Sequence, residues 1–164
     1  MTVLAALAVA MAFMLGELWL SKRHERALLV RGAVAAADPV YGAMRWAYPA
    51  AFVAMAVEGF LRGSPRFAVA GAVLFVAAKL LKFWAIASLG ERWTFKVFVL
   101  PDAPLVASGP YRFMRHPNYV GVIGELAAMA MLTGARVAGP LAFVSFSWLL
   151  LRRITAEEKA LRIG

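Results

Sequence analysis

Two stretches in the C-terminal half of the chain combine residue types that bind small charged molecules. The first is Leu105-Val-Ala-Ser-Gly-Pro-Tyr-Arg-Phe-Met-Arg-His-Pro-Asn-Tyr119. Its Gly109-Pro110 pair indicates a turn, and Pro117 biases His116 away from helix while suiting the first turn of a following helix. The start of that helix would present backbone N–H groups and a positive partial charge to an anionic group such as a carboxylate. Aromatic surface for a purine ring or a sulfonium comes from Tyr111, Phe113 and Tyr119.

The second stretch, Arg152–Leu161, is charged and has a helical composition. On a helix, Arg153 and Glu157 are neighbours at i,i+4, so an ordinary salt bridge on a solvated face would explain them. The first stretch also has a plain explanation, in which its arginines and tyrosines form a belt at a membrane interface. Spacing alone leaves both interpretations open for both stretches.

The composition indicates that these stretches belong to a membrane protein. Hydrophobic residues make up 63% of the 164 residues and charged residues 16%, against about 45–50% and 25% in soluble proteins. A single small core could not bury so much apolar side chain, because small globules keep a large surface. The sequence has no cysteine and two histidines, which excludes disulfides and thiolate sites and predicts no metal site.

The apolar runs predict an all-α fold, a polytopic transmembrane helical bundle of about five spans. The expected spans are Thr2–Leu20, about 45–61, Phe67–Leu89, about 118–133 and Val137–Leu151. We find no internal repeat or low-complexity linker, so residues 1–164 are expected to form a single membrane domain.

The basic residues predict the orientation of these spans. With the N-terminus outside, thirteen of the eighteen Lys and Arg residues fall on the inner side and three, Arg62, Arg66 and Arg136, on the outer side. The positive-inside rule therefore favours an N-out, C-in topology. The net charge of +9 is divided among short clusters between apolar runs, which is typical of topology signals and contacts with membrane lipids and not of a nucleic-acid surface.

The loop Gly90–His116 and the tail after Arg152 both fall on the inner side in this topology, where they can meet. Loops of this length are uncommon in compact domains unless they are functional. We therefore expect a cytoplasmic cofactor pocket, formed by the loop before the fourth span and the C-terminal tail.

Several ionisable residues fall within the apolar runs, where they usually face a cavity or each other. They are Glu17, Glu58, Lys79, Lys82 and Glu125. Glu125 lies about two turns beyond His116, so it either pairs with a lysine of the third span as a structural contact or lines a substrate cavity. We slightly favour the structural pairing.

The two stretches together resemble the isoprenylcysteine carboxyl methyltransferase family of integral membrane enzymes, which share this pattern with phospholipid methyltransferases. The matching residues are Leu105-Val106, Ser108-Gly109-Pro110-Tyr111, Arg115-His116-Pro117-Asn118-Tyr119-Val120-Gly121, Arg153, Glu157-Glu158 and Leu161. Glu17–Arg26 and Arg31-Gly-Ala33 look like short bacterial members. The resemblance covers residues 89–161 most strongly, and we expect a catalytic core over 67–164 preceded by N-terminal helices and loops over 1–66.

The resemblance implies transfer of a methyl group from S-adenosyl-L-methionine to a lipophilic acceptor that enters from the bilayer. It places the cofactor against Lys96, Ala103, Pro104, Leu105, Val106, Tyr111, His116, Pro117, Asn118, Tyr119 and Glu157, and it makes Arg153 the substrate-binding, catalytic arginine. Ala103-Pro104 stands where the family commonly has a histidine before the Leu-Val pair. The implied location is a bacterial inner membrane, with the active site facing the cytoplasm.

The chemistry of the acceptor remains open at this point. A carboxylate needs no base, and Arg153 would only have to orient it. A long-chain phenol has a pKa of about 10 and would gain from a base, for which His116 and Glu125 are the candidates. Phospholipid N-methylation is an alternative, and its amine must first lose a proton.

Two further alternatives belong to other classes of protein. Membrane sterol-type reductases carry a similar Arg-His-Pro-Asn-Tyr string and use a dinucleotide, although the tail signature argues against them. A non-enzymatic membrane scaffold would leave the polar loop and tail without a ligand.

Overall fold

The computed structural model describes residues 2–62, 65–101 and 103–161. Over these residues the chain forms five long helices, α1 (Thr2–Val30), α2 (Tyr41–Arg62), α3 (Ala68–Leu89), α4 (Pro117–Thr133) and α5 (Ala138–Ala160). Three-residue and four-residue 3-10 helices, η1 (Gly90–Arg92) and η2 (Gly109–Arg112), lie between α3 and α4. The predicted helical bundle is confirmed in this part of the chain.

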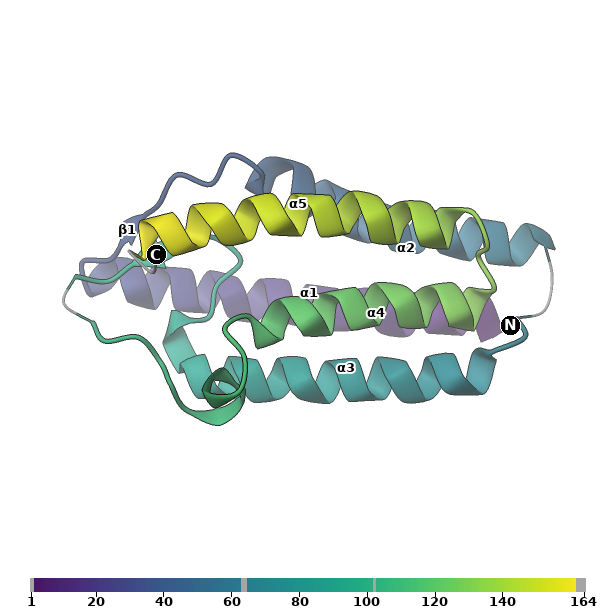
Figure 1. Ribbon diagram of the computed structural model, residues 1–164, viewed down its shortest axis with the longest axis horizontal. Coiled ribbons are helices and arrows are strands. Elements are labelled where there is room, and N and C mark those ends of the chain that lie inside the picture. The colour runs from purple at the N-terminus through teal and green to yellow at the C-terminus, as the bar shows by residue number, and fades with distance from the viewer. Residues whose placement is uncertain (1, 63–64, 102, 162–164) are drawn as a thin grey trace.

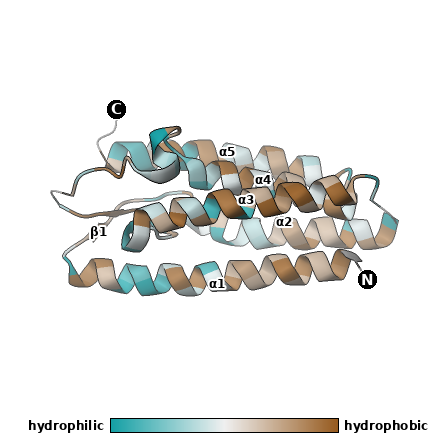
Figure 2. Ribbon diagram, turned by 90° about the horizontal axis from the view of Figure 1, so that it is seen from below, coloured by the Kyte–Doolittle hydropathy of each residue, from teal (hydrophilic) through white to brown (hydrophobic). Residues whose placement is uncertain are grey.

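The five helices run along the long axis of the molecule in alternating directions, as Figure 1 shows. This alternation gathers the α1–α2 connection, the α3–α4 loop and the end of α5 at one end of the bundle. The start of α1 and the connection between α4 and α5 lie at the opposite end. Hydrophilic residues concentrate at the first of these ends (Figure 2).

Two of the helices extend beyond the membrane spans expected from the sequence. The first was expected to end at Leu20 but continues to Val30, and α5 continues past the expected span end at Leu151, through the tail of helical composition, to Ala160. An apolar run defines the segment of a helix that could span a membrane, and it does not show where the helix itself ends. The charged residues that follow carry no Gly or Pro before Gly32, so nothing in the backbone stops the first helix at Leu20.

Within the described part of the chain, two helices are long and apolar enough to cross a membrane by length and composition alone, over Val3–Val30 and Ala68–Arg92. Spanning by the other three helices stays a prediction. Large apolar side chains nevertheless point outward from them as well, including Val57 of α2, Val120 of α4 and Val144 of α5, each more than half exposed. Such a surface is unusual for a protein surrounded by water.

A two-stranded antiparallel ladder joins the two loops at the polar end. Strand β1 (Val34–Ala35) pairs with β2 (Phe98–Val99), with Val34 opposite Val99 and Ala35 opposite Phe98. This ladder was not predicted, because two-residue strands have no detectable alternation of apolar and polar residues. It fixes the α1–α2 connection against the long loop before α4.

Helices α3 and α4 approach each other closely because two glycines of α4 face α3. A Cβ atom at Gly121 would lie 3.2 Å from the carbonyl oxygen of Ala78 and 3.2 Å from Cβ of Lys82. A Cβ atom at Gly124 would lie 3.0 Å from Cβ of Ala78. Small residues of this kind let helix backbones pack at short range where lipid surrounds them. The contact brings Lys82 beside Glu125 on the next turn of α4.

Four buried charges from three helices form a closed cluster in the middle of the bundle. Lys79 of α3 contacts Glu17 of α1 at 2.8 Å and Glu125 of α4 at 3.0 Å. Lys82 contacts the same two carboxylates at 2.6 Å and 3.3 Å. The hydroxyl of Tyr48 in α2 donates to Glu125 at 2.7 Å. The expected pairing of Glu125 with the lysines of the third span is thus confirmed, and Glu17 completes it.

The remaining ionisable residue of the apolar runs, Glu58, closes the opposite end of the bundle. Its carboxylate accepts the backbone N–H groups of Arg136, Val137 and Ala138 at 2.6–3.2 Å. These donors precede and open α5, so a carboxylate there satisfies free N–H groups and stabilises the helix dipole.

We predict that Lys82→Met strongly destabilises the protein, because Glu17 and Glu125 would then share only Lys79 as a cation. Removing one partner of a buried ion pair typically costs about 3–5 kcal/mol in the free energy of unfolding. Thermal unfolding of the detergent-purified protein, followed by circular dichroism, measures the effect. Lys22→Met is the matched control, since it breaks an i,i+3 pair with Glu25 in which the lysine is half exposed. An equal loss in both variants would contradict a stabilising role for the cluster.

Candidate active site

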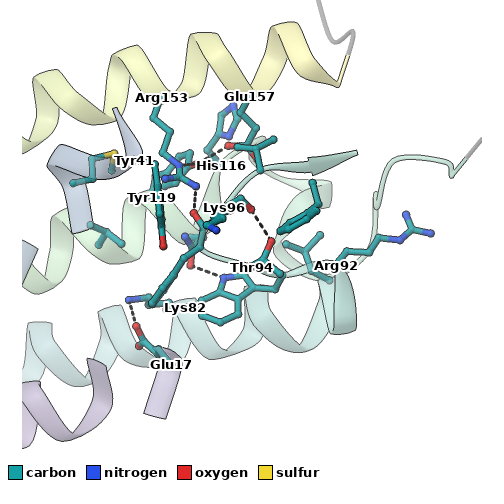
Figure 3. Close-up of a pocket in the computed structure, with 18 of the residues that line it drawn as sticks. Glu17, Tyr41, Lys82, Arg92, Thr94, Lys96, His116, Tyr119, Arg153 and Glu157 are labelled. Atoms are coloured by element: carbon teal, nitrogen blue, oxygen red, sulfur yellow. Dashed lines mark hydrogen bonds and ion pairs between the residues drawn. The ribbon is translucent and has the colours of Figure 1, made fainter. Parts of the chain in front are cut away.

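A cavity of about 860 Å³ opens at the polar end of the bundle, where the long loop meets the last helix. Its walls come from all five long helices, from the loop residues 92–107 and from Tyr111 of η2. Figure 3 shows the polar side chains of its walls, with Arg153 and Glu157 above, Tyr119 and Lys96 in the centre and Glu17 and Lys82 below. The expected meeting of loop and tail is therefore found in the structure.

The central polar contact joins the two stretches singled out from the sequence. The hydroxyl of Tyr119 accepts a hydrogen bond from Nε of Arg153 at 2.9 Å and donates one to Oε2 of Glu157. Arg153 and Glu157 do not bridge each other directly, so the surface salt bridge considered from spacing is not formed. Both residues lie on the cavity-facing side of α5 and both line the cavity.

His116 precedes α4 and also contacts the tail. Its Nε2 lies 3.1 Å from Oε1 of Glu158, and its ring stacks on the ring of Tyr119 with centroids 5.5 Å apart. A carboxylate can only accept, so in a neutral imidazole this contact places the proton on Nε2, and Nδ1 is then the ring nitrogen that can accept a proton. The pairing resembles the carboxylate–histidine arrangement of general bases.

The start of α4 is built as the sequence predicts. His116 occupies the position before the helix, with φ −128° and ψ 58°, and Pro117 opens the helix and is fully buried. The side chain of Asn118 accepts a hydrogen bond from the indole N–H of Trp93 at 3.2 Å. That bond ties the start of α4 to the beginning of the long loop.

Helix α1 holds the long loop in place. The hydroxyl of Ser21 accepts the backbone N–H of Phe95 at 2.8 Å, and Nδ1 of His24 donates to the carbonyl of Trp93 at 2.8 Å. Arg92 donates to the carbonyl of Pro104 further along the loop. The charged end of α1, which lies beyond the span expected from hydropathy, therefore holds residues 93–95 in place.

Asp38, in the connection between α1 and α2, is a site residue that the sequence analysis missed. Its Oδ2 lies 3.1 Å from Nη1 of Arg153, and its Oδ1 accepts the N–H groups of Val40 and Tyr41 at 3.2 and 3.0 Å. An acidic residue just before an apolar helix is a capping signal, which could have located the cap. Nothing in the sequence indicates the contact with Arg153 across 115 positions.

The cavity brings together nearly all residues that the family resemblance implied. Its walls include Lys96, Ala103, Pro104, Leu105, Val106, Tyr111, His116, Asn118, Tyr119, Arg153 and Glu157. Two predicted site residues are not among its lining. Pro117 is fully buried, and Glu125 lies in the ion cluster, where its side chain is 1% exposed. A catalytic role for Glu125 stays a prediction.

Tyr111 faces the same cavity from η2. Burial, and secondarily the negative charge of Glu157, raise the pKa of its phenol well above the usual value. Tyr111 is therefore neutral over the whole physiological range and offers a ring face and a hydrogen-bonding hydroxyl, but no charge. Gly109 allows η2 to pack on α3, since a Cβ atom there would overlap with Oγ of Ser88 and its φ is +60°.

Comparison with protein families agrees with this arrangement of residues. The model of the isoprenylcysteine carboxyl methyltransferase family matches residues 71–163, which is more than half of the chain. This chain belongs to that family. The match includes both signature stretches, the helices α4 and α5, and all of α3 except its first three residues.

Two bacterial relatives are also similar to this chain. One is an uncharacterized protein of Bacillus subtilis called YpbQ, 40% identical over 91 residues, which are 56% of this chain and 54% of that protein. The chain thus matches about half the length of that relative. An uncharacterized protein of Haemophilus influenzae is 29% identical over 149 residues, covering 88% of this chain and 86% of the other. No solved structure matches significantly.

Both the apolar outer surface and the cavity agree with membership of a membrane-associated methyltransferase family. The family match begins at Gly71, however, so it does not include α1, α2 or the connection between them. The structure adds Ser21, Asp38 and Tyr41 from that region to the surroundings of the signature residues. The N-terminal helices therefore support the site as well as the bundle.

Proposed function

We propose that this protein is an S-adenosyl-L-methionine-dependent methyltransferase that acts on a lipophilic acceptor within the membrane. The observation that carries the proposal is the convergence of Tyr119, Arg153 and Glu157 on one cavity. These residues come from the two stretches that resemble the family's cofactor and substrate site. The cavity volume is within the range of about 300–1,000 Å³ that small-molecule sites occupy.

The residues at the polar end of the cavity suit each part of the cofactor. The carboxylate of Glu157 would hold its ammonium group, and the start of α4 would receive its carboxylate. Tyr111 and Tyr119 offer ring faces to the sulfonium or the purine, and Leu105 and Val106 offer apolar surface. When bound, the cofactor supplies a methyl group on a positively charged sulfur.

The inner part of the cavity suits an apolar acceptor. Methionines and leucines from α1 and α2 line it, namely Met11, Met14, Leu15, Leu18 and Met44, together with Phe146 and Leu150 of α5. Methionine adapts its shape to irregular apolar ligands. A hydrocarbon chain could extend between these helices while its polar end points toward Arg153, so the acceptor would enter from the surrounding lipid.

The topology that agrees with this function is five spans with the N-terminus outside. The loop-bearing end, with most of the basic residues, would then lie at the cytoplasmic face of a bacterial inner membrane, where the water-soluble cofactor is available. The exposed arginines of that end, such as Arg112 and Arg115, would contact anionic lipid headgroups. His116, oriented by Glu158, would act as the base for an acceptor that must lose a proton.

We predict that Glu157→Ala abolishes cofactor binding while the protein remains folded, because the ammonium group of the cofactor would lose its carboxylate partner. Calorimetry with S-adenosylhomocysteine measures binding, and circular dichroism measures folding. Lys159→Ala is the control, since Lys159 is exposed on the same helix. Binding of a nicotinamide dinucleotide to the wild type in place of S-adenosylhomocysteine would refute the methyltransferase and favour a reductase.

We predict that Arg153→Gln retains S-adenosylhomocysteine binding but lowers turnover by at least about a hundredfold, the usual scale for losing a group that positions a substrate. The adjacent Arg152→Gln is the matched control, because Arg152 is exposed and packs over the ring of Trp148. Methylation is measured as transfer of a labelled methyl group to a lipophilic probe. Full turnover by Arg153→Gln would remove Arg153 from the reaction.

A further inference from the structure

Arg153 already has a carboxylate partner within this chain. Its Nη1 pairs with Oδ2 of Asp38 at 3.1 Å, Nε donates to the hydroxyl of Tyr119, and Nη2 donates to the carbonyl of Phe95. Each of the three guanidinium nitrogens is therefore engaged. The side chains are also removed from water, with Arg153 8% and Asp38 5% exposed.

Asp38 is held rigidly in the position from which it contacts Arg153. Its second oxygen caps the first turn of α2 through Val40 and Tyr41. The segment before it is fixed by the β1–β2 ladder and by a hydrogen bond from the N–H of Ala36 to the carbonyl of Val97 at 2.8 Å. Asp38 therefore cannot move away from Arg153 without breaking the start of α2.

The pair changes what Arg153 can recognise in an acceptor. An unpaired guanidinium favours a carboxylate, but here the charge of Asp38 cancels that attraction and repels a second carboxylate. An uncharged hydroxyl can accept the remaining N–H groups of Arg153 without that repulsion.

On the basis of the methyltransferase function proposed above, we infer that Asp38 is a positioning and specificity-determining residue that selects an uncharged hydroxyl as the methyl acceptor over a carboxylate. Arg153 polarises that hydroxyl, and Asp38 keeps Arg153 from binding anions. The preference comes from a segment outside the family match, which begins at Gly71. Asp38 thereby distinguishes a hydroxyl from a carboxylate, which the signature residues alone would not do.

The atoms balance with groups already in the cavity. The acceptor oxygen forms the new C–O bond as the methyl–sulfur bond breaks, and that electron pair remains on sulfur as a neutral thioether. The hydroxyl proton passes to Nδ1 of His116, and the resulting imidazolium is stabilised by Glu158 at 3.1 Å. A carboxylate acceptor would need no such base.

A matched pair of probes tests the inference directly. Para-decylphenol and para-decylbenzoate have the same apolar chain and ring and differ in the hydroxyl or carboxylate. Binding to the protein saturated with S-adenosylhomocysteine is followed by fluorescence of the cavity tryptophans, Trp46 and Trp93. We expect the wild type to bind the phenol about tenfold or more tightly than the benzoate, because the negative charge of Asp38 repels the carboxylate of the benzoate.

Asp38→Asn isolates the charge of this residue, because asparagine caps helices as well as aspartate does. We expect it to bind the benzoate at least about tenfold more tightly than the wild type does, through removal of the negative charge. In turnover, the KM for the benzoate falls accordingly, whereas a merely structural role would lower kcat for both probes. Asp38→Glu, which restores the charge, should return the preference toward the phenol.

Two controls keep the outcomes distinct. Glu91→Gln removes an exposed carboxylate paired with Arg31 and should leave the ratio of the two probes unchanged. If Asp38→Asn does not fold, Asp38→Ser retains a capping oxygen and removes the charge. A wild type that prefers the benzoate, binds neither probe, or keeps its ratio in the charge-removing variant overturns the inference. Failure to bind S-adenosylhomocysteine would instead overturn the proposed function itself.

Discussion

Charges in this molecule must be compensated where water is absent, and that constraint determines much of its architecture. The pairs of Lys79 and Lys82 with Glu17 and Glu125 hold α1, α3 and α4 together across an otherwise apolar interior. The pair of Arg153 and Asp38 does the same at the polar end, where it joins α5 to the connection before α2. An isolated ion in either place would cost several kcal/mol. Each of these three buried cations is therefore paired with a carboxylate from another helix or loop.

The alternating direction of five helices gives the second constraint. It collects the α1–α2 connection, the long α3–α4 loop and the end of α5 at one end of the bundle. The proposed function needs polar groups for a water-soluble cofactor beside apolar walls for a lipophilic acceptor, and both are available where these loops meet the apolar helices. The cavity lies at that boundary, with Glu157 near its polar part and the methionines of α1 and α2 in its apolar part.

Much of the bundle could be predicted, since apolar runs locate helices without reference to packing. The approximate positions of all five helices and the meeting of the long loop with the tail followed from composition and charge. The extension of α1 to Val30 could not be read from hydropathy, because the additional turns are held by Ser21 and His24 on a distant loop. The β1–β2 ladder was missed because two-residue strands carry no pattern of their own.

The sequence by itself determined the class of protein, its family and most of the residues around the cavity, because these depend on composition and on motifs that are continuous along the chain. Only the tertiary structure decided how those residues are paired. Glu157 binds Tyr119 in place of its i,i+4 neighbour Arg153, and Arg153 binds Asp38 from a segment more than a hundred positions away. Such choices depend on which donors and acceptors the fold brings within about 3 Å. The spacing of residues along the sequence does not give these distances in space.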